Sequence, residues 1–164
     1  MKSIELRKAK IKDARRIKNL LYRMIKEEYK ECPSIFMPPN IKNELSIKKL
    51  KKNINSKNDI IYVACIDNII IGVITTGVKK GLKSINNNKH GMLIRLYVIK
   101  KQRRKGVATR LINKCKKYYS NKGIDEVRLS VFGYNKKALK LYTKLGYTYY
   151  FSLMSDKAHE IKII

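Results

Sequence analysis

A basic turn between a strand-like run and a helix-like run holds the residues best suited to chemistry. Met92–Ile99 is apolar and rich in β-branched residues, five of the six residues from Lys100 to Lys105 are Lys or Arg, and Gly106 follows. A helix N-terminus offers unpaired N–H groups and the positive end of the helix dipole, and glycine lets an anion approach the backbone. The stretch therefore predicts an anion site, and we expect it to bind the phosphates of a cofactor.

Apolar periodicity along the rest of the chain predicts the elements that position this turn. Two-residue alternation and β-branched runs predict strands at Ile4–Ala9, Ile60–Ile66, Ile69–Thr75, Met92–Ile99, Val127–Phe132 and Tyr147–Leu153, with an edge piece at Ile161–Ile164. Helical spacing predicts helices from Asp13 to Tyr29, over Ile41–Ile54, from Val107 to a stop at Asn121–Gly123, and from Asn135 to Gly146.

Turn residues separate these elements. Asp67-Asn68 stands alone between two strand runs, which is the spacing of a tight hairpin. Cys32–Asn40 contains all three prolines and Gly81–Gly91 is polar, so both are predicted to be loops. On the third helix, Val107, Leu111, Cys115 and Tyr118 recur on one face.

The order β-α-α-β-β-β-α-β-α-β predicts an α/β fold with a mixed central sheet flanked by helices. The sheet should be antiparallel first and parallel around the later crossover helix. The 164 residues are enough for one compact domain, so we expect a single domain over residues 1–164.

Composition excludes several classes of protein. No apolar run approaches the roughly 20 residues that span a bilayer, and the charged N-terminus lacks a signal-peptide core, so no membrane partner is expected. Three separate cysteines and two histidines predict neither a metal site nor a disulfide framework. The expected compartment is the reducing cytoplasm.

The net charge of +27 and the pI near 10.1 have two interpretations. Lysines are spread over the whole chain, and the abundance of Lys, Asn and Ile fits an A/T-rich coding bias, so the charge fits a solvated basic surface. The alternative is a nucleic-acid or ribosome partner. Either surface would attract an anionic cofactor.

Two motifs give the chain its resemblance to a known family. Arg103–Ala108 matches [Q/R]-x-x-G-x-[G/A], and Asn135–Tyr147 matches N-x-x-A-x-x-L/F-Y-x-x-x-G-F/Y. With this order of elements, Ile60–Phe151 resembles the GNAT superfamily of acyl-CoA N-acyltransferases. P-loop, GxGxxG, HExxH and GxSxG motifs are all missing from the sequence.

The resemblance implies a role for each matched residue. The turn would wrap the pyrophosphate of acetyl-CoA, the strand before it would pair its backbone with the pantetheine arm, and Asn135 would contact the cofactor or orient the strands. Tyr142 would protonate the leaving thiolate, because a phenol with a reference pKa of about 10 can exchange a proton with a thiol. The implied cofactor-binding residues are Leu96, Tyr97, Val98, Arg103, Arg104, Lys105, Gly106, Val107, Ala108, Thr109 and Asn135.

Each of these residues also has a purely structural interpretation. Tyr142 lies on the apolar face of its helix, which fits a core residue. Asn135 is a suitable N-cap without any ligand. Leu96–Val98 fits an ordinary buried strand.

The sequence departs from the family at the general base. Many relatives carry a glutamate near the position of Arg95, and bacterial protein N-terminal acetyltransferases carry one at the position of Ser130. A carboxylate of the first two helices (Glu27, Glu28 or Glu44), a water chain or a backbone carbonyl could serve instead. Without a dedicated base, an α-amino group of pKa about 7.7–8.0 is an easier acceptor than a lysine-like amine of about 10.4.

The sequence thus predicts an enzyme that transfers an acetyl group from acetyl-CoA to a primary amine by direct attack in a ternary complex. The acceptor would be a peptide N-terminus or a small-molecule amine, and the protein a monomer or homodimer. The alternative is a catalytically weak basic module of the same fold that binds RNA or the ribosome.

Overall fold

The computed structural model describes residues 3–33, 45–80 and 89–149. Its contacts divide the chain into two compact units, Met1–Ser130 and Val131–Ile164, and each unit is described by itself. The single domain over residues 1–164 therefore stays a prediction.

The first unit is built around a five-stranded sheet of order β1-β2-β3-β4-β5. Neighbouring strands run antiparallel, except that β4 and β5 are parallel, as expected around a crossover helix. The strands are β1 (Glu5–Lys8), β2 (Asp59–Ile66), β3 (Ile69–Lys80), β4 (Lys89–Val98) and β5 (Val127–Leu129). The helices are α1 (Ala14–Glu31), α2 (Ile47–Ile54) and α3 (Val107–Ser120), with short 3₁₀ helices at Ile11–Asp13 and Lys100–Gln102. The second unit contains α4 (Lys136–Lys144).

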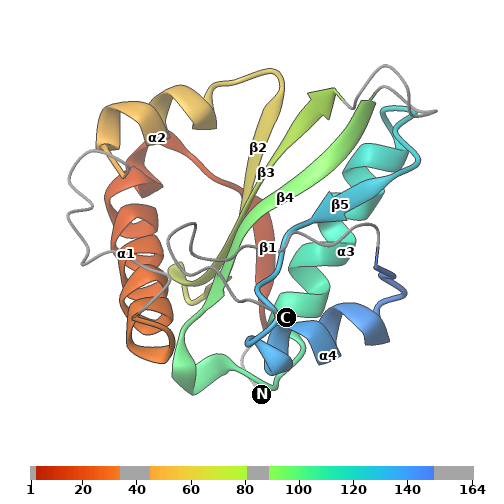
Figure 1. Cartoon of the computed structure of the whole chain (residues 1–164). Helices are drawn as coiled ribbons and strands as arrows, with labels where there is room; N and C mark the ends of the chain where they lie inside the picture. The colour runs from red at the N-terminus through yellow and green to blue at the C-terminus, as the bar shows by residue number, and fades with distance from the viewer. Residues whose placement is uncertain (1–2, 34–44, 81–88, 150–164) are drawn as a thin grey trace, which may run out of the picture. The chain divides into compact units, whose positions relative to one another are not determined.

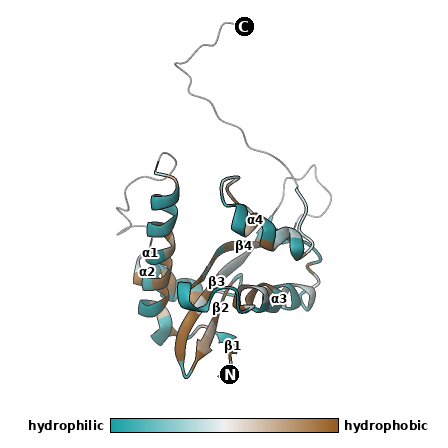
Figure 2. Cartoon of the chain, turned by 90° about the horizontal axis from the view of Figure 1, so that it is seen from below, coloured by the Kyte–Doolittle hydropathy of each residue, from teal (hydrophilic) through white to brown (hydrophobic). Residues whose placement is uncertain are grey.

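Helices cover both faces of this sheet (Figure 1). α1 and α2 lie over one face, and α3 lies over the other. Ile17 and Leu20 of α1 and Val63 of β2 are fully buried in the core on the first side. Leu111 and Cys115 of α3 are fully buried on the second. Figure 2 shows hydrophobic residues along the strands and hydrophilic residues over much of α1, so the mixed sheet flanked by helices is confirmed.

One local prediction holds for a clear reason, and a second holds only for the position of the residue. Asp67 and Asn68 take φ angles of 50° and 62°, the left-handed pair that a two-residue hairpin of right-handed twist requires. Asp13 precedes α1 as expected, but its carboxylate accepts hydrogen bonds from the Lys10 N–H at 2.7 Å and from Arg7 at 2.7 and 3.1 Å. Asp13 therefore links the start of α1 to Arg7 of β1, and its side chain does not cap an N–H group of α1.

Several predicted boundaries are wrong. α2 begins at Ile47 and not at Ile41, because the Ser46 hydroxyl accepts from the Lys49 N–H at 3.0 Å and caps the helix there. β4 begins at Lys89, inside the predicted polar loop, because pairing with β3 continues to that residue.

The last residue of the buried face of α3 was predicted wrongly. Tyr119 rather than Tyr118 is fully buried, and its phenol hydrogen-bonds the buried Thr76 hydroxyl. Gly91 makes room for the ring, since a Cβ atom there would lie 2.5 Å from it.

The C-terminal strands were overpredicted. β5 ends at Leu129 rather than Phe132, and 147–149, the described part of Tyr147–Leu153, is not in a strand. Ile161–Ile164, most of the Cys32–Asn40 loop and residues 81–88 of Gly81–Gly91 lie outside the described residues. No helix in the described ranges is long and apolar enough to cross a membrane.

Candidate functional site

β4 leaves part of one edge without a partner strand. β5 pairs with β4 only at Gly91–Leu93, and no described strand continues that pairing beyond Leu93. At the same place Ile94 is an extra residue, because Thr75 pairs with Arg95 while Thr76 pairs with Leu93. The bulge and the lost pairing together open the edge of β4 from Ile94 onward.

Alternation of hydrogen bonds decides which backbone groups face this open edge. The Ile99 N–H donates to the Ile71 carbonyl at 2.9 Å, which fixes that pair as a hydrogen-bonded one. In an antiparallel ladder such pairs alternate, so Tyr97 also points its N–H and C=O towards β3. The N–H groups of Leu96 and Val98 therefore face the open edge.

The turn after β4 forms a concave array of backbone N–H groups. Arg104 and Gly106 take φ angles of 65° and 75°, and Gly106 is the N-cap residue of α3. The N–H groups of residues 104–109 find no acceptor within the described part of the chain. A Cβ on Gly106 would meet no described atom within 4 Å, so the space beside this residue is open. Such an array at a helix start fits a phosphate group.

Arg103 is held by protein groups. Its Nε donates to the Val98 carbonyl at 2.8 Å, and its Nη2 donates to Glu27 Oε2 at 2.6 Å. Its guanidinium lies 5.3 Å from the centre of the Tyr97 ring, whose hydroxyl donates to Glu27 Oε1 at 2.8 Å. Arg103 thus ties the turn to β4 and α1, and its contact with a cofactor stays a prediction.

Two adjacent glutamates of α1 have opposite pKa shifts. Burial raises the pKa of Glu27, but the hydrogen bonds from Arg103 and Tyr97 outweigh it, and the net shift is downward. Burial raises the pKa of Glu28, and the nearby charge of Arg95 opposes that rise without cancelling it. Glu44 lies outside the described residues.

The second unit holds the other two predicted residues. The Asn135 side chain accepts from the Ala138 N–H at 3.0 Å, so it is the N-cap of α4. The Tyr142 ring packs edge-on against Tyr147 at 5.8 Å. The roles of Asn135 and Tyr142 towards the cofactor stay predictions, because each unit is described by itself.

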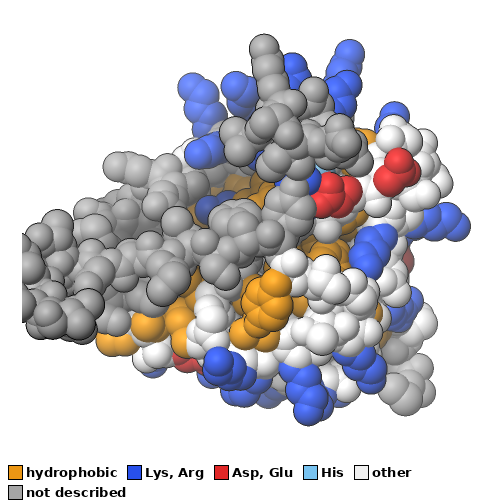
Figure 3. Space-filling view, turned by 45° about the vertical axis from the view of Figure 1, so that its right-hand side comes forward, with side chains coloured by type: hydrophobic (Ala, Val, Ile, Leu, Met, Phe, Trp, Pro, Cys, Tyr) orange, Lys and Arg blue, Asp and Glu red, His pale blue; other side chains and the backbone are white. Residues whose placement is uncertain are grey.

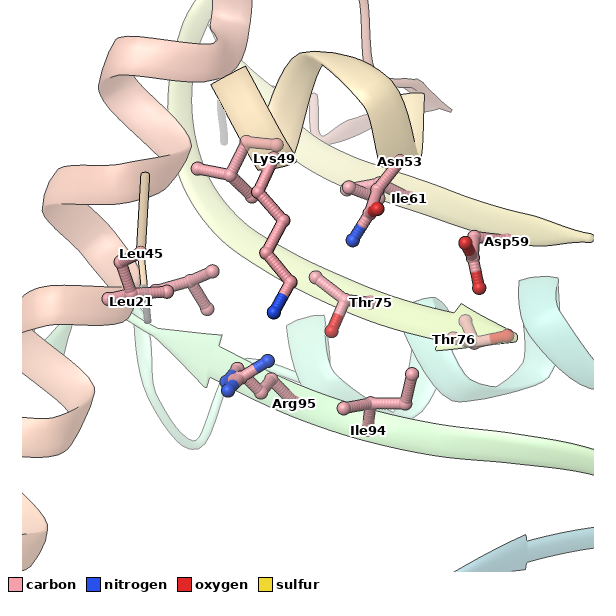
Figure 4. Close-up of a pocket in the computed structure, with 11 residues that line it drawn as sticks. Leu21, Leu45, Lys49, Asn53, Asp59, Ile61, Thr75, Thr76, Ile94 and Arg95 are labelled. Carbon is pink, nitrogen blue, oxygen red and sulfur yellow. The ribbon is translucent and has the colours of Figure 1, made fainter. Parts of the chain in front are cut away.

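A pocket of about 170 Å³ lies within the first unit, between α2 and the sheet. Figure 4 shows Lys49 reaching into it from α2 and Arg95 from β4, with the Thr75 hydroxyl in the same space and Asp59 at the far end. The sequence analysis did not assemble this pocket, because its residues are scattered over five elements and form no motif. The bulge could have been suspected from an arginine within an apolar strand.

Charged groups are distributed without a dominant cluster on the face seen in Figure 3, where Lys and Arg side chains lie at many separate positions. No group of three or more His, Cys, Asp or Glu residues that could hold a metal occurs in the described ranges. Cys65 and Cys115 are buried free thiols.

The fold is shared with solved structures, one of which is an acetyltransferase. A mutant of the BH1408 protein of Bacillus halodurans superposes with a TM-score of 0.83 at 18% identity, over 93% of this chain and 98% of that one. The aminoglycoside N-acetyltransferase AAC(6′)-Iy, in complex with CoA, superposes with a TM-score of 0.74 at 15% identity, over 97% of each chain.

Sequence comparison gives a short match and a long one. Thialysine N-epsilon-acetyltransferase of Mus musculus is 41% identical over 51 residues, which make up 31% of this chain and 30% of that protein. The match thus spans less than a third of that relative's length. Residues 21–147, which include β4, the turn and α4, match the Acetyltransferase (GNAT) family. The chain therefore belongs to the GNAT acetyltransferase family.

Proposed function

We propose that this protein is an N-acetyltransferase that moves an acetyl group from acetyl-CoA to a primary amine. The observation that carries the proposal is the continuity of the open β4 edge with the array of unpaired N–H groups at residues 104–109. An extended arm ending in phosphates fits such a path, with the arm along the strand and the phosphates at the start of α3.

Acetyl-CoA supplies the acetyl thioester. The N–H groups around Gly106 bind its pyrophosphate, and those of Leu96 and Val98 face the edge where the arm would lie. The Val98 N–H donates to the acetyl oxygen and stabilises the charge that develops there. Tyr142 gives its phenolic proton to the leaving thiolate. The matched motifs contain no cysteine, so the amine reacts directly and no acyl-enzyme forms.

Glu28 is the carboxylate best suited to accept the amine proton. Its raised pKa brings it nearer the working pH, which favours proton transfer, whereas Glu27 is engaged by Arg103 and Tyr97. Glu28 also lies close enough to Arg95, a pocket-lining residue, for that charge to act on it.

The acceptor is a peptide N-terminus or a small-molecule amine. The names of similar proteins point to small amines, since one is an aminoglycoside N-acetyltransferase and another acts on thialysine. Those substrates belong to those proteins, and the pocket of this chain is the better guide to its own acceptor.

Binding and turnover test the proposal. The purified protein should show a thermal shift with acetyl-CoA and with coenzyme A, and it should release coenzyme A in the presence of an acceptor from a panel of amines and peptides. Desulfo-coenzyme A is a useful control, because it retains the phosphates and should still bind. A folded protein that shows no thermal shift with acetyl-CoA, coenzyme A or desulfo-coenzyme A would overturn the proposal.

A further inference from the structure

The pocket between α2 and the sheet carries two cations without direct partners. Lys49 and Arg95 both line it, and neither side chain forms a hydrogen bond or ion pair with another described residue. Glu28 of α1 is close enough for its charge to interact with that of Arg95, but Glu28 does not line the pocket. The Asp59 carboxylate lies at the far end of the pocket (Figure 4).

The same pocket contains a buried hydroxyl without a partner. Thr75 is 8% exposed, and its Oγ1 atom makes no hydrogen bond with any residue that the structure describes. Buried hydroxyls are nearly always paired, because an unpaired one loses its bonds to water without replacement. Its hydroxyl therefore fits a hydrogen bond to a ligand atom.

These groups match a carboxylate better than any other common substituent of an amine. Arginine offers two parallel donors to a carboxylate, lysine adds a mobile ammonium, and a hydroxyl can donate a third bond. Leu21, Leu50 and Ile61 supply apolar walls for a short carbon chain. An acceptor with several ammonium groups would meet like charges here.

The cations are separate from the phosphate site. The unpaired N–H groups follow the C-terminal end of β4, whereas Arg95 lies at the bulge and lines the pocket on the α2 side of the sheet. Both sites therefore can be filled at once, as direct transfer in a ternary complex requires.

We propose that the pocket formed by Lys49, Arg95 and Thr75 selects acceptors that carry a carboxylate as well as the primary amine, which makes small amino acids the substrate class. The proposal rests on the N-acetyltransferase function. It also gives the cations a second effect, because a nearby positive charge disfavours the ammonium form and leaves more of the reactive neutral amine.

Matched acceptors test the carboxylate directly. The pairs β-alanine and ethylamine, γ-aminobutyrate and propylamine, and ε-aminocaproate and pentylamine differ only by the carboxylate. The carboxylated member of at least one pair should have a kcat/KM about ten-fold higher or more, the size of a lost charge-assisted hydrogen bond. The pair with the largest ratio measures the distance between amine and carboxylate that the pocket accepts.

Variants assign the preference to the pocket. Lys49→Met and Arg95→Met should each lower this ratio about ten-fold, mainly by raising the KM of the carboxylated member, and Arg95→Lys should retain part of it. Lys48→Met removes an exposed lysine that is next to Lys49 on α2 and does not line the pocket, so it should leave the ratio unchanged.

Each outcome has one meaning. Equal kcat/KM values within every pair, or no turnover of any carboxylated amine by a protein that binds acetyl-CoA, would overturn the carboxylate proposal and leave cofactor binding intact. A protein that binds neither acetyl-CoA nor coenzyme A would instead remove the acetyltransferase function on which it rests. If Arg95→Met fails to fold, the wild-type ratios and the Lys49 variant still decide.

Discussion

Glu27 and Glu28 are adjacent acids of α1 with different surroundings. Glu27 accepts hydrogen bonds from Tyr97 and Arg103, which stabilise its charged form. Burial destabilises the charge of Glu28 and raises its pKa. Position in the sequence does not separate the two residues. Their contacts do, because they tie Glu27 to the turn and leave Glu28 as the acid that we propose for proton transfer.

Replacing Glu28 should slow the reaction and change its pH dependence. Because a base acts as carboxylate, activity should rise with pH as Glu28 loses its proton, at a pH above the ordinary glutamate pKa of 4.5. Glu28→Gln should lower kcat about 100-fold and abolish this rising limb, while Glu28→Asp should keep part of both. A pH profile of kcat/KM for the three proteins checks this, and an unchanged profile in Glu28→Gln would exclude the role.

Tyr142 is tested by removing one oxygen atom. Tyr142→Phe keeps the aromatic ring that packs on Tyr147 but removes the proton donor, so kcat should fall about 100-fold while acetyl-CoA affinity hardly changes. Tyr147→Phe is the matched control and should leave kcat near wild type. Steady-state kinetics with a thermal-shift titration separate the two effects, and equal kcat values in both variants would leave Tyr142 a packing residue.

At the scale of elements, the turn before α3 should bind phosphate through its backbone shape. Gly106 and Gly123 both have positive φ angles, of 75° and 65°, and an added Cβ at either would meet nothing within 4 Å. Alanine at either site should cost about 1–2 kcal/mol of stability from backbone strain alone. Only Gly106→Ala should also weaken acetyl-CoA binding, because a methyl group within the proposed phosphate site would keep a phosphate from approaching the backbone closely.

Chemical denaturation and a binding titration on both glycine variants measure these two quantities. Similar losses of stability with a loss of affinity in Gly106→Ala alone are expected. Equal affinities in the two variants would contradict a phosphate site at this turn.

Most helices and strands could be predicted from the sequence, because their patterns depend on neighbouring residues. The features that the sequence did not predict depend on contacts between distant parts of the chain. The hairpin at Asp67-Asn68 and the N-cap at Asn135 depend on neighbouring residues, so their patterns were sufficient. Tyr119 of α3 is buried because Gly91 of β4 makes room for its ring, and helical spacing alone does not reveal this contact. The turn at Gly106 was found from its motif, whereas the pocket with Lys49 required the folded chain.

At the scale of the whole molecule, the charge of +27 acts as a diffuse field. Lys and Arg side chains lie at many separate positions on the face seen in Figure 3. We therefore expect weak, sequence-independent RNA binding that falls steeply with salt and is weaker than about micromolar at physiological ionic strength. Fluorescence anisotropy of a labelled RNA across a salt series measures this, with polyglutamate as an anionic competitor that has no bases. Nanomolar binding that survives both salt and polyglutamate would favour the RNA-binding alternative.

The extra residue at Ile94 has a consequence for the whole sheet. Cross-strand partners share a face, so Leu93 lies on the side of Thr76 and Tyr119, whereas Arg95 lies on the side of Thr75. Odd-numbered residues thus change sides in the middle of β4. Because of this one inserted residue, the first half of β4 directs Leu93 towards α3. The second half directs the Arg95 guanidinium towards the opposite side of the sheet. Insertions and deletions in β4, more than substitutions, would therefore be the mutations that exchange the two surfaces of this enzyme.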